Sequence, residues 1–302
     1  MQTSFLLATL AGLCGMLGWG FGDFFAKKTI DVVGDMVTLA WAHFAGLVLM
    51  SGLCLIELQK PSVFGQQGGV LPQTAKDWAG LAFFGALQAI VYFFVYRAFA
   101  VGKVSLLNPV FSTYSGFVVL LSVLIFGETL HVSQALVLAL VFVGVLLMSI
   151  EQDSAALRRF SFKKMHGMSD IVIATVLASI WTLFWARFVN GKDWLIYATL
   201  MYAFMSLTVL AIAAAQRLKL TVPDRSIWKY FLLIGIGEVV AYAGISWGYG
   251  QTSHTSIVAV LSSAFSVPTV ILARMFLGEK IGRLQVAGVV CVILGGVGLA
   301  LL

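Results

Sequence analysis

Two stretches of the chain carry the same pattern of residues. Residues 105–128 read SLLNPVFSTYSGFVVLLSVLIFGE, and residues 256–279 read SIVAVLSSAFSVPTVILARMFLGE, 151 positions later. The match continues beyond both stretches. The identical pairs include Ser105 and Ser256, Ser112 and Ser263, Ser115 and Ser266, Gly127-Glu128 and Gly278-Glu279, Gln134 and Gln285, and Gly144 and Gly295. The chain therefore contains an internal duplication.

The composition is that of a membrane protein that crosses the bilayer many times. Of all residues, 60% are hydrophobic and only 11% are charged, which would leave a water-soluble protein with an apolar surface. A membrane helix needs about 20 apolar residues, and the long apolar runs lack the alternation of barrel strands. We predict an all-α protein with ten transmembrane helices at 4–26, 34–56, 77–101, 104–126, 132–150, 169–189, 194–216, 227–250, 255–277 and 284–302.

The predicted helices divide evenly between the two copies. Five crossings per copy is an odd number, so the second copy enters the membrane upside down relative to the first. We predict two inverted five-helix repeats at 1–151 and 152–302, joined by a polar segment around 151–166. This segment is interpreted as a solvated linker, with a regulatory or lipid-binding role as the alternative. Inverted repeats are the architecture of secondary transporters.

Several functional classes lack support in the sequence. Cys14, Cys54 and Cys291 are scattered in apolar segments without metal-ligand spacing, so neither a metal nor a cofactor is expected. There is no phosphate-binding loop and no convergent set of catalytic groups, so we do not expect an enzyme or an ATP-driven pump. The net charge of +6 is attributed to cytoplasmic loops and lipid headgroups, and no nucleic-acid partner is expected.

Loop charges give a prediction of orientation. Most Lys and Arg residues follow the odd-numbered segments, whereas the other side has only Lys60, Lys76, Arg187 and Lys192. The positive-inside rule then places the odd-numbered loops in the cytoplasm and both termini outside. The first apolar run is expected to act as its own insertion signal. We predict a multi-pass protein of a prokaryotic inner membrane.

Glu238 is the clearest polar group inside a predicted helix. It lies in the middle of the eighth segment, with Tyr242 one turn later on the same face. A carboxylate at that depth is costly unless it is protonated or paired with a cation. Proton coupling or binding of a substrate ammonium would explain it, and a hydrogen bond between helices is the structural alternative.

The third segment is the repeat partner of the eighth. It carries Gln88 and Tyr92 one turn apart, at nearly the same level, while strict alignment pairs Leu87 with Glu238. The acid therefore has no counterpart in the other half. We predict a site that is chemically asymmetric on a symmetric scaffold, with Gln88 and Tyr92 contacting the substrate.

Two tryptophans are predicted to form opposite walls of a cavity. Trp19 and Asp23 share a face of the first segment, and Trp181 occupies the corresponding place in the sixth. For the tryptophans the alternative is ordinary core packing. Asp23 is a candidate for proton coupling, with pairing to Lys27 as the alternative. His43, inside the second segment, is open to three roles: a buried neutral histidine, a proton carrier or a binding group.

The fourth segment contains Asn108 followed by Pro109. A proline in a helix frees carbonyls in the previous turn, which a cavity or the Asn108 amide would satisfy, so Asn108 is predicted to bind substrate. Val260 replaces this proline in the second copy, where Pro268 follows two turns later, so the two helix breaks need not be equivalent. The duplicated serines suit either a shared site or close packing.

The motifs resemble the EamA family of the drug/metabolite transporter superfamily over essentially the whole chain. They are Gly18-Trp19-Gly20, Asn108-Pro109, Gly127-Glu128, Gln134 and Gly144, then Gly278-Glu279-Lys280, Gln285 and Gly295-Gly296. The resemblance implies a ten-helix carrier of small metabolites that works by alternating access, with a cavity lined by the first four helices of each half. It also implies that the fifth and tenth helices are peripheral or form a homodimer contact, and that the termini are often cytoplasmic, against the loop charges. Glu128 and Glu279 are assigned to turn structure or gating.

These observations predict a secondary transporter of small organic metabolites, in which Trp19, Tyr92, Trp181 and Tyr242 wall a cavity. Gln88 and Asn108 hydrogen-bond the substrate, and Glu238 binds a proton or an ammonium group. The aromatic, weakly charged cavity favours amino acids or other amphiphilic solutes. A channel or uniporter and a non-transporting scaffold are the alternatives, and import versus export is open.

Overall fold

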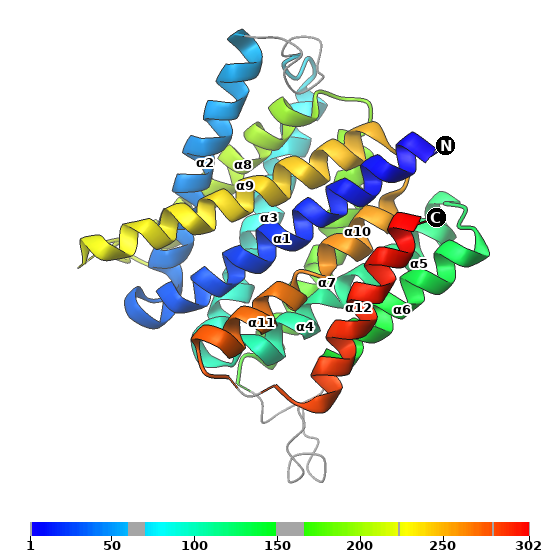
Figure 1. Cartoon of the computed structure of the whole chain (residues 1–302). Coiled ribbons are helices and arrows are strands. Elements are labelled where there is room, and N and C mark those ends of the chain that lie inside the picture. Colours follow the sequence, from blue (N-terminus) through cyan, green and yellow to red (C-terminus); the bar gives the residue numbers. More distant parts are fainter. Residues whose placement is uncertain (1, 60–69, 149–165, 223, 280, 302) are drawn as a thin grey trace.

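The computed structural model describes residues 2–59, 70–148, 166–222, 224–279 and 281–301, and every regular element in these residues is helical. The predicted repeat boundary at 151/152 and most of the linker lie outside the described residues. The elements (Figure 1) are α1 (Gln2–Val33), α2 (Asp35–Gln59), α3 (Ala75–Val101), α4 (Val104–Ser112), α5 (Tyr114–Phe126), α6 (Val132–Met148), α7 (Met168–Val189), α8 (Trp194–Ala215), the 3-10 turn η3 (Arg225–Ile227), α9 (Trp228–Gln251), α10 (Thr255–Ser263), α11 (Ser266–Phe276) and α12 (Arg283–Leu301).

Eight stretches of the described chain are long and apolar enough to cross a membrane, counting α4–α5 and α10–α11 as one stretch each. The fifth and tenth predicted crossings are shorter apolar helices at Val132–Met148 and Arg283–Gly296. The prediction of a helical membrane protein is therefore confirmed, whereas the number ten stays a prediction. Many outward-facing side chains are large and apolar, such as Leu124 at 70% exposed and Leu136 at 67%, as a lipid-facing surface requires.

The first helix is longer than the sequence indicated. The predicted segment ended at residue 26, but α1 continues to Val33 and ends before Gly34, whose φ of 86° requires glycine. Lys27 does not mark a loop, because its ammonium donates to Asp31 at 2.7 Å and to the Phe99 carbonyl at 2.9 Å. These contacts also show that Lys27 pairs with Asp31, and not with Asp23.

The fourth predicted helix of each half is interrupted. One break lies at Thr113, between α4 and α5, and the other at Ala264 and Phe265, between α10 and α11. Thr113 and Ala264 are 151 positions apart, so the breaks are equivalent although Pro109 has no counterpart. Pro109 itself lies inside α4, one turn before the break. The carbonyl that it leaves free, that of Ser105, accepts from the Gln285 amide at 3.2 Å, and not from Asn108.

Each of the two duplicated Gly-Glu turns forms hydrogen bonds with the other half of the chain. Gly127 and Gly278 have φ of 64° and 68° and end α5 and α11, a left-handed conformation that glycine adopts readily. The Glu128 carboxylate then accepts from the Ser256 amide at 3.1 Å and from its hydroxyl at 2.9 Å, at the start of α10. Glu279 accepts from the Ser105 amide at 3.2 Å, at the start of α4. The two interrupted helices therefore run antiparallel.

Small residues bring the central helices close together. α1 runs alongside α9 over a long contact (Figure 1), and a Cβ added to Gly237 would lie 2.5 Å from the Gly18 carbonyl oxygen. α6 and α12 pack against each other at the edge of the bundle, where a Cβ on Gly144 would lie 2.7 Å from the Gly288 carbonyl oxygen. The glycines of these two peripheral helices thus serve for packing between helices of the same chain.

Candidate functional site

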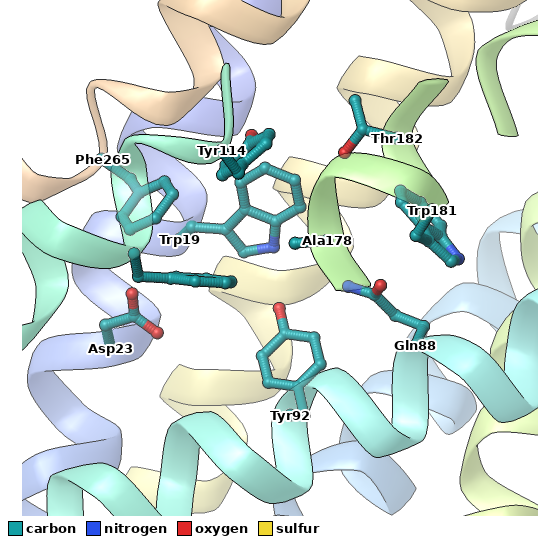
Figure 2. Close-up of a pocket in the computed structure, with 10 residues that line it drawn as sticks. Trp19, Asp23, Gln88, Tyr92, Tyr114, Ala178, Trp181, Thr182 and Phe265 are labelled. Atoms are coloured by element: carbon teal, nitrogen blue, oxygen red, sulfur yellow. The ribbon is translucent and has the colours of Figure 1, made fainter. Parts of the chain in front are cut away.

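A small cavity lies where helices of both halves meet. Five residues predicted from the sequence line it: Trp19, Asp23, Gln88, Tyr92 and Trp181. They come from α1, α3 and α7, and Figure 2 shows them around one space. The volume is about 20 Å³, room for about one water molecule. A substrate therefore enters only after helices have moved apart.

Five further residues line the cavity that the sequence prediction did not include: Phe111, Tyr114, Ala178, Thr182 and Phe265. A signal for two of them was available. Tyr114 and Phe265 are 151 positions apart; Tyr114 directly follows the first break, and Phe265 lies in the second. Their rings stack with centroids 6.5 Å apart. The repeat therefore places one aromatic ring from each half at the same point of the cavity.

The two predicted tryptophan walls are linked through Tyr242. Its ring makes edge-to-face contacts with Trp19 at 5.6 Å and with Trp181 at 5.9 Å between centroids. Its hydroxyl accepts from the Gln88 amide at 2.6 Å. Tyr242 thus lies behind the lining and fixes the positions of three residues that form it.

Asn108 and Asp23 form a pair at one side of the cavity. The Asn108 amide donates to a carboxylate oxygen of Asp23 at 3.1 Å, and both side chains are buried. Asn108 is not among the described residues that line the cavity, but it contacts one that does. The second amide atom, Asn108 Oδ1, has no hydrogen-bond partner among the described residues.

Glu238 lies one layer behind the cavity, beside His43. Its carboxylate accepts from the Tyr202 hydroxyl at 2.8 Å, and its Oε2 is 3.7 Å from His43 Nε2. His43 Nδ1 lies 2.9 Å from the Leu39 carbonyl oxygen, an acceptor, so this nitrogen carries a hydrogen. Nε2 is then free to accept or to bind a second proton. The three predicted proton-coupling residues therefore form two groups, Glu238 with His43 and Asp23 alone.

Basic side chains pair with acids at the ends of the helices. Arg97 binds Asp170 through two hydrogen bonds, at 2.8 and 2.6 Å, and joins α3 to α7. At the other end of α3, Lys192 contacts Asp77. Among the described residues that line the cavity, none is Lys, Arg or His. The interior charge is thus carried by carboxyl groups.

The duplicated serines pack the two interrupted helices together. The Ser263 hydroxyl donates to Ser115 at 2.8 Å, while Ser112 bonds the Asn108 carbonyl at 3.1 Å. None of these serines is among the residues that line the cavity in the described structure. The sequence left two roles open for these serines, a shared site or close packing, and their contacts are those of packing.

Comparison with known proteins identifies the family. The model of the EamA-like transporter family matches residues 6–150 and 165–301, one match per repeat. No curated protein matches the chain. A solved crystal structure shares the fold, with a TM-score of 0.73 and 18% identity over 97% of this chain and 96% of its own. The chain therefore belongs to the EamA-like transporter family of the drug/metabolite transporter superfamily, and is a multi-pass membrane transporter of small solutes.

Proposed function

We propose that the protein is a secondary carrier that moves small organic metabolites by alternating access. The observation that carries this proposal is the small cavity, which is lined by both halves, holds five of the predicted residues and has no room for a solute until helices move apart. A channel would need a continuous path, whereas a carrier exposes a central site to one side at a time. The substrates that we propose are amphiphilic solutes, amino acids among them.

The proposed scaffold is a pair of inverted repeats, residues 1–151 and 152–302, with ten crossings. The two separate family matches and the antiparallel course of the interrupted helices support it. The Gly-Glu turns act as gates, since each one attaches one half to the other. We place the protein in a prokaryotic inner membrane, where lipid surrounds it. A homodimer through the outer faces of α6 and α12 belongs to the same proposal.

The proposed binding residues act at two levels. Trp19, Gln88, Tyr92 and Trp181 contact the substrate directly, because they line the cavity. Asn108 and Tyr242 hold these residues in place through their hydrogen bonds and ring contacts. A substrate that enters the opened cavity would therefore meet aromatic faces and a few polar groups, as in most small-molecule sites.

We propose that Glu238 and His43 couple transport to protons. The pair is buried, and the two groups are 3.7 Å apart. The hydrogen-bond partners described for them, the Tyr202 hydroxyl and the Leu39 carbonyl, are both uncharged. A permanent charge would be costly at this buried position, so groups that can bind and release a proton are favoured there. Asp23 is the other candidate for a proton in the wall of the cavity.

The decisive experiment is uptake into proteoliposomes. A panel of radiolabelled amino acids, amines, sugars and nucleosides is tested with and without a pH gradient, for the native chain and for Glu238→Gln. Saturable accumulation that follows the gradient and that Glu238→Gln uncouples supports the proposal. Saturable flux that ignores both the gradient and the substitution means a uniporter. No flux of any solute means a scaffold and overturns the proposal.

A further inference from the structure

The cavity contains a carboxyl group that has no cationic partner among the described residues. Asp23 is 6% exposed and lines the cavity. The described hydrogen bond to it comes from the neutral amide of Asn108, 3.1 Å away. No Lys, Arg or His among the described residues forms an ion pair with it. A buried carboxylate in this situation lacks the positive charge that would stabilise it.

Aromatic rings surround the same space. Trp19, Tyr92, Tyr114 and Trp181 line it together with two phenylalanines. The faces of such rings attract ammonium groups, most strongly when both are removed from water. A carboxyl group at the wall of an aromatic cavity is the combination that recognises an organic ammonium ion, because the rings replace its hydration and the carboxylate balances its charge.

Two buried polar atoms in the lining have no partner. Trp19 Nε1 and Gln88 Oε1 make no hydrogen bond with any described residue. Figure 2 shows Asp23 and Gln88 on opposite sides of the cavity, with the Trp19 nitrogen and the Tyr92 hydroxyl directed into the space between them. A buried donor or acceptor without a partner is costly. Trp19 Nε1 and Gln88 Oε1 are therefore suited to bind polar groups of a bound molecule.

We infer that the cavity binds a small organic monocation, an amine whose ammonium group pairs with Asp23. This inference rests on the proposed function and adds the charge of the preferred substrate. A solute with a carboxylate would bring a second charge into a lining that offers only neutral donors. The cavity therefore prefers an amine to the corresponding zwitterionic amino acid, and both to a carboxylate.

Asp23, and not Glu238, is the residue that meets the ammonium group. Glu238 is 2% exposed, binds Tyr202 and faces His43, and it is not among the described residues that line the cavity. The two buried acids thus have different tasks. Asp23 recognises the charge of the solute, while Glu238 is left for the proton.

The test is binding to the purified full-length protein in detergent, measured by calorimetry. Four probes share a phenylethyl body and differ only in charge: phenethylamine, 2-phenylethanol, phenylalanine and 3-phenylpropionate. We expect phenethylamine to bind at least about tenfold more tightly than the neutral alcohol, as a charge-assisted hydrogen bond allows. Phenylalanine and 3-phenylpropionate should bind more weakly than the amine.

Variants locate the preference. Asp23→Asn keeps the size of the side chain and should bring the amine and the alcohol within about twofold of each other. Asp23→Glu retains the charge and should retain the preference. Asp31→Asn is the matched control, because it makes the same change two turns along α1 at an exposed acid, and it should leave the preference intact.

Each outcome decides the inference. Equal binding of amine and alcohol by the native protein overturns it, as does a preference that survives Asp23→Asn or the failure of all four probes to bind. The native comparison decides by itself if Asp23→Asn does not fold. If the amine binds in this pattern but proteoliposomes show no flux, the proposed function fails and the assignment of the site holds. If proteoliposomes show saturable flux but binding shows no charge preference, the proposed function holds and the assignment of the site fails.

Discussion

The α1–α9 and α3–α7 interfaces are equivalent under the repeat, and each joins one half to the other, but they are built differently. Gly18 and Gly237 bring α1 against α9 so closely that a Cβ on Gly18 would lie 2.7 Å from the Ala241 nitrogen. Between α3 and α7, aromatic rings fill the space, with Phe84 and Trp185 centroids 5.6 Å apart, and Arg97 pairs with Asp170 at one end.

This difference indicates which interface opens. Close backbone packing through glycine is lost completely when the helices separate, since no side chain spans the gap. Large rings and an ion pair at a helix end can rearrange through rotamer changes while some contact remains. The cavity is lined from both α3 and α7, so we expect the α3–α7 interface to move during transport and the α1–α9 interface to stay closed.

The largest expected effect comes from breaking the glycine interface. Gly18→Leu places a branched side chain against the backbone of α9 and should lower the free energy of unfolding by about 3 kcal/mol or more, as overpacking does. Thermal unfolding in detergent and the yield of monodisperse protein measure it. Gly52→Leu in α2 is the matched control, because a Cβ there meets nothing within 4 Å. Equal stability of the two variants would contradict the assigned role of this interface.

The second prediction compares the two Gly-Glu turns. Glu128 contacts both the amide and the hydroxyl of Ser256, whereas the described bond of Glu279 is to the Ser105 amide. Glu128→Ala should therefore cost about 1–2 kcal/mol and Glu279→Ala about 0.5–1 kcal/mol, the range of helix caps and charged hydrogen bonds. Chemical unfolding in detergent gives both values. A larger loss for Glu279→Ala would reverse the asserted asymmetry.

A smaller effect is expected at the end of the α3–α7 interface. The Arg97 side chain is 48% exposed, so solvent screens the ion pair, and Arg97→Ala should cost less than about 1 kcal/mol of stability. The rate of transport should change more than the stability, because the pair restrains a moving interface. The exchanged pair Arg97→Asp with Asp170→Arg should restore the native rate. An unchanged rate in Arg97→Ala would show that this interface does not move.

The smallest predicted effect is a dependence of stability on pH. Burial raises the pKa of the Glu128 carboxyl above its ordinary value. The folded state then holds this proton more strongly than the unfolded state, so its contribution to stability is present at low pH. It is lost as the pH rises from about 4.5 through the raised pKa. Glu128→Gln should remove this loss of stability with rising pH. If the unfolding midpoints of the native protein and Glu128→Gln differ by a constant amount across that pH range, the predicted pH dependence is refuted.

The sequence was sufficient for the class of fold and for much of the cavity. Hydrophobic length predicted the helices, and the polar groups at Gln88 and Tyr92 stood out because such groups are rare in membranes. Glu238 stood out for the same reason, but depth along a helix does not reveal which neighbouring side chains cover it. Its position behind the lining arises from packing between helices.

Other parts of the site could not be predicted from single positions. Aromatic residues are so common here that Phe111 carried no signal by itself, whereas Tyr114 and Phe265 were recognisable only as a repeat pair. The breaks at Thr113 and Ala264 follow from contacts between the two interrupted helices. Neither residue type ends a helix by its intrinsic propensity, and Pro109 drew attention to the wrong turn.

The reciprocal contacts of Glu128 and Glu279 also bear on how such a chain arose. Each half supplies an acceptor for the first turn of a helix in the other, and a membrane has no water to replace it. On the proposed inverted-repeat scaffold, a half-length ancestor would have needed a second copy in the opposite orientation to complete its own helix ends. Residues 1–151 and 152–302 expressed separately should therefore be degraded, and coexpression should rescue both; independent accumulation of either half would disprove this dependence.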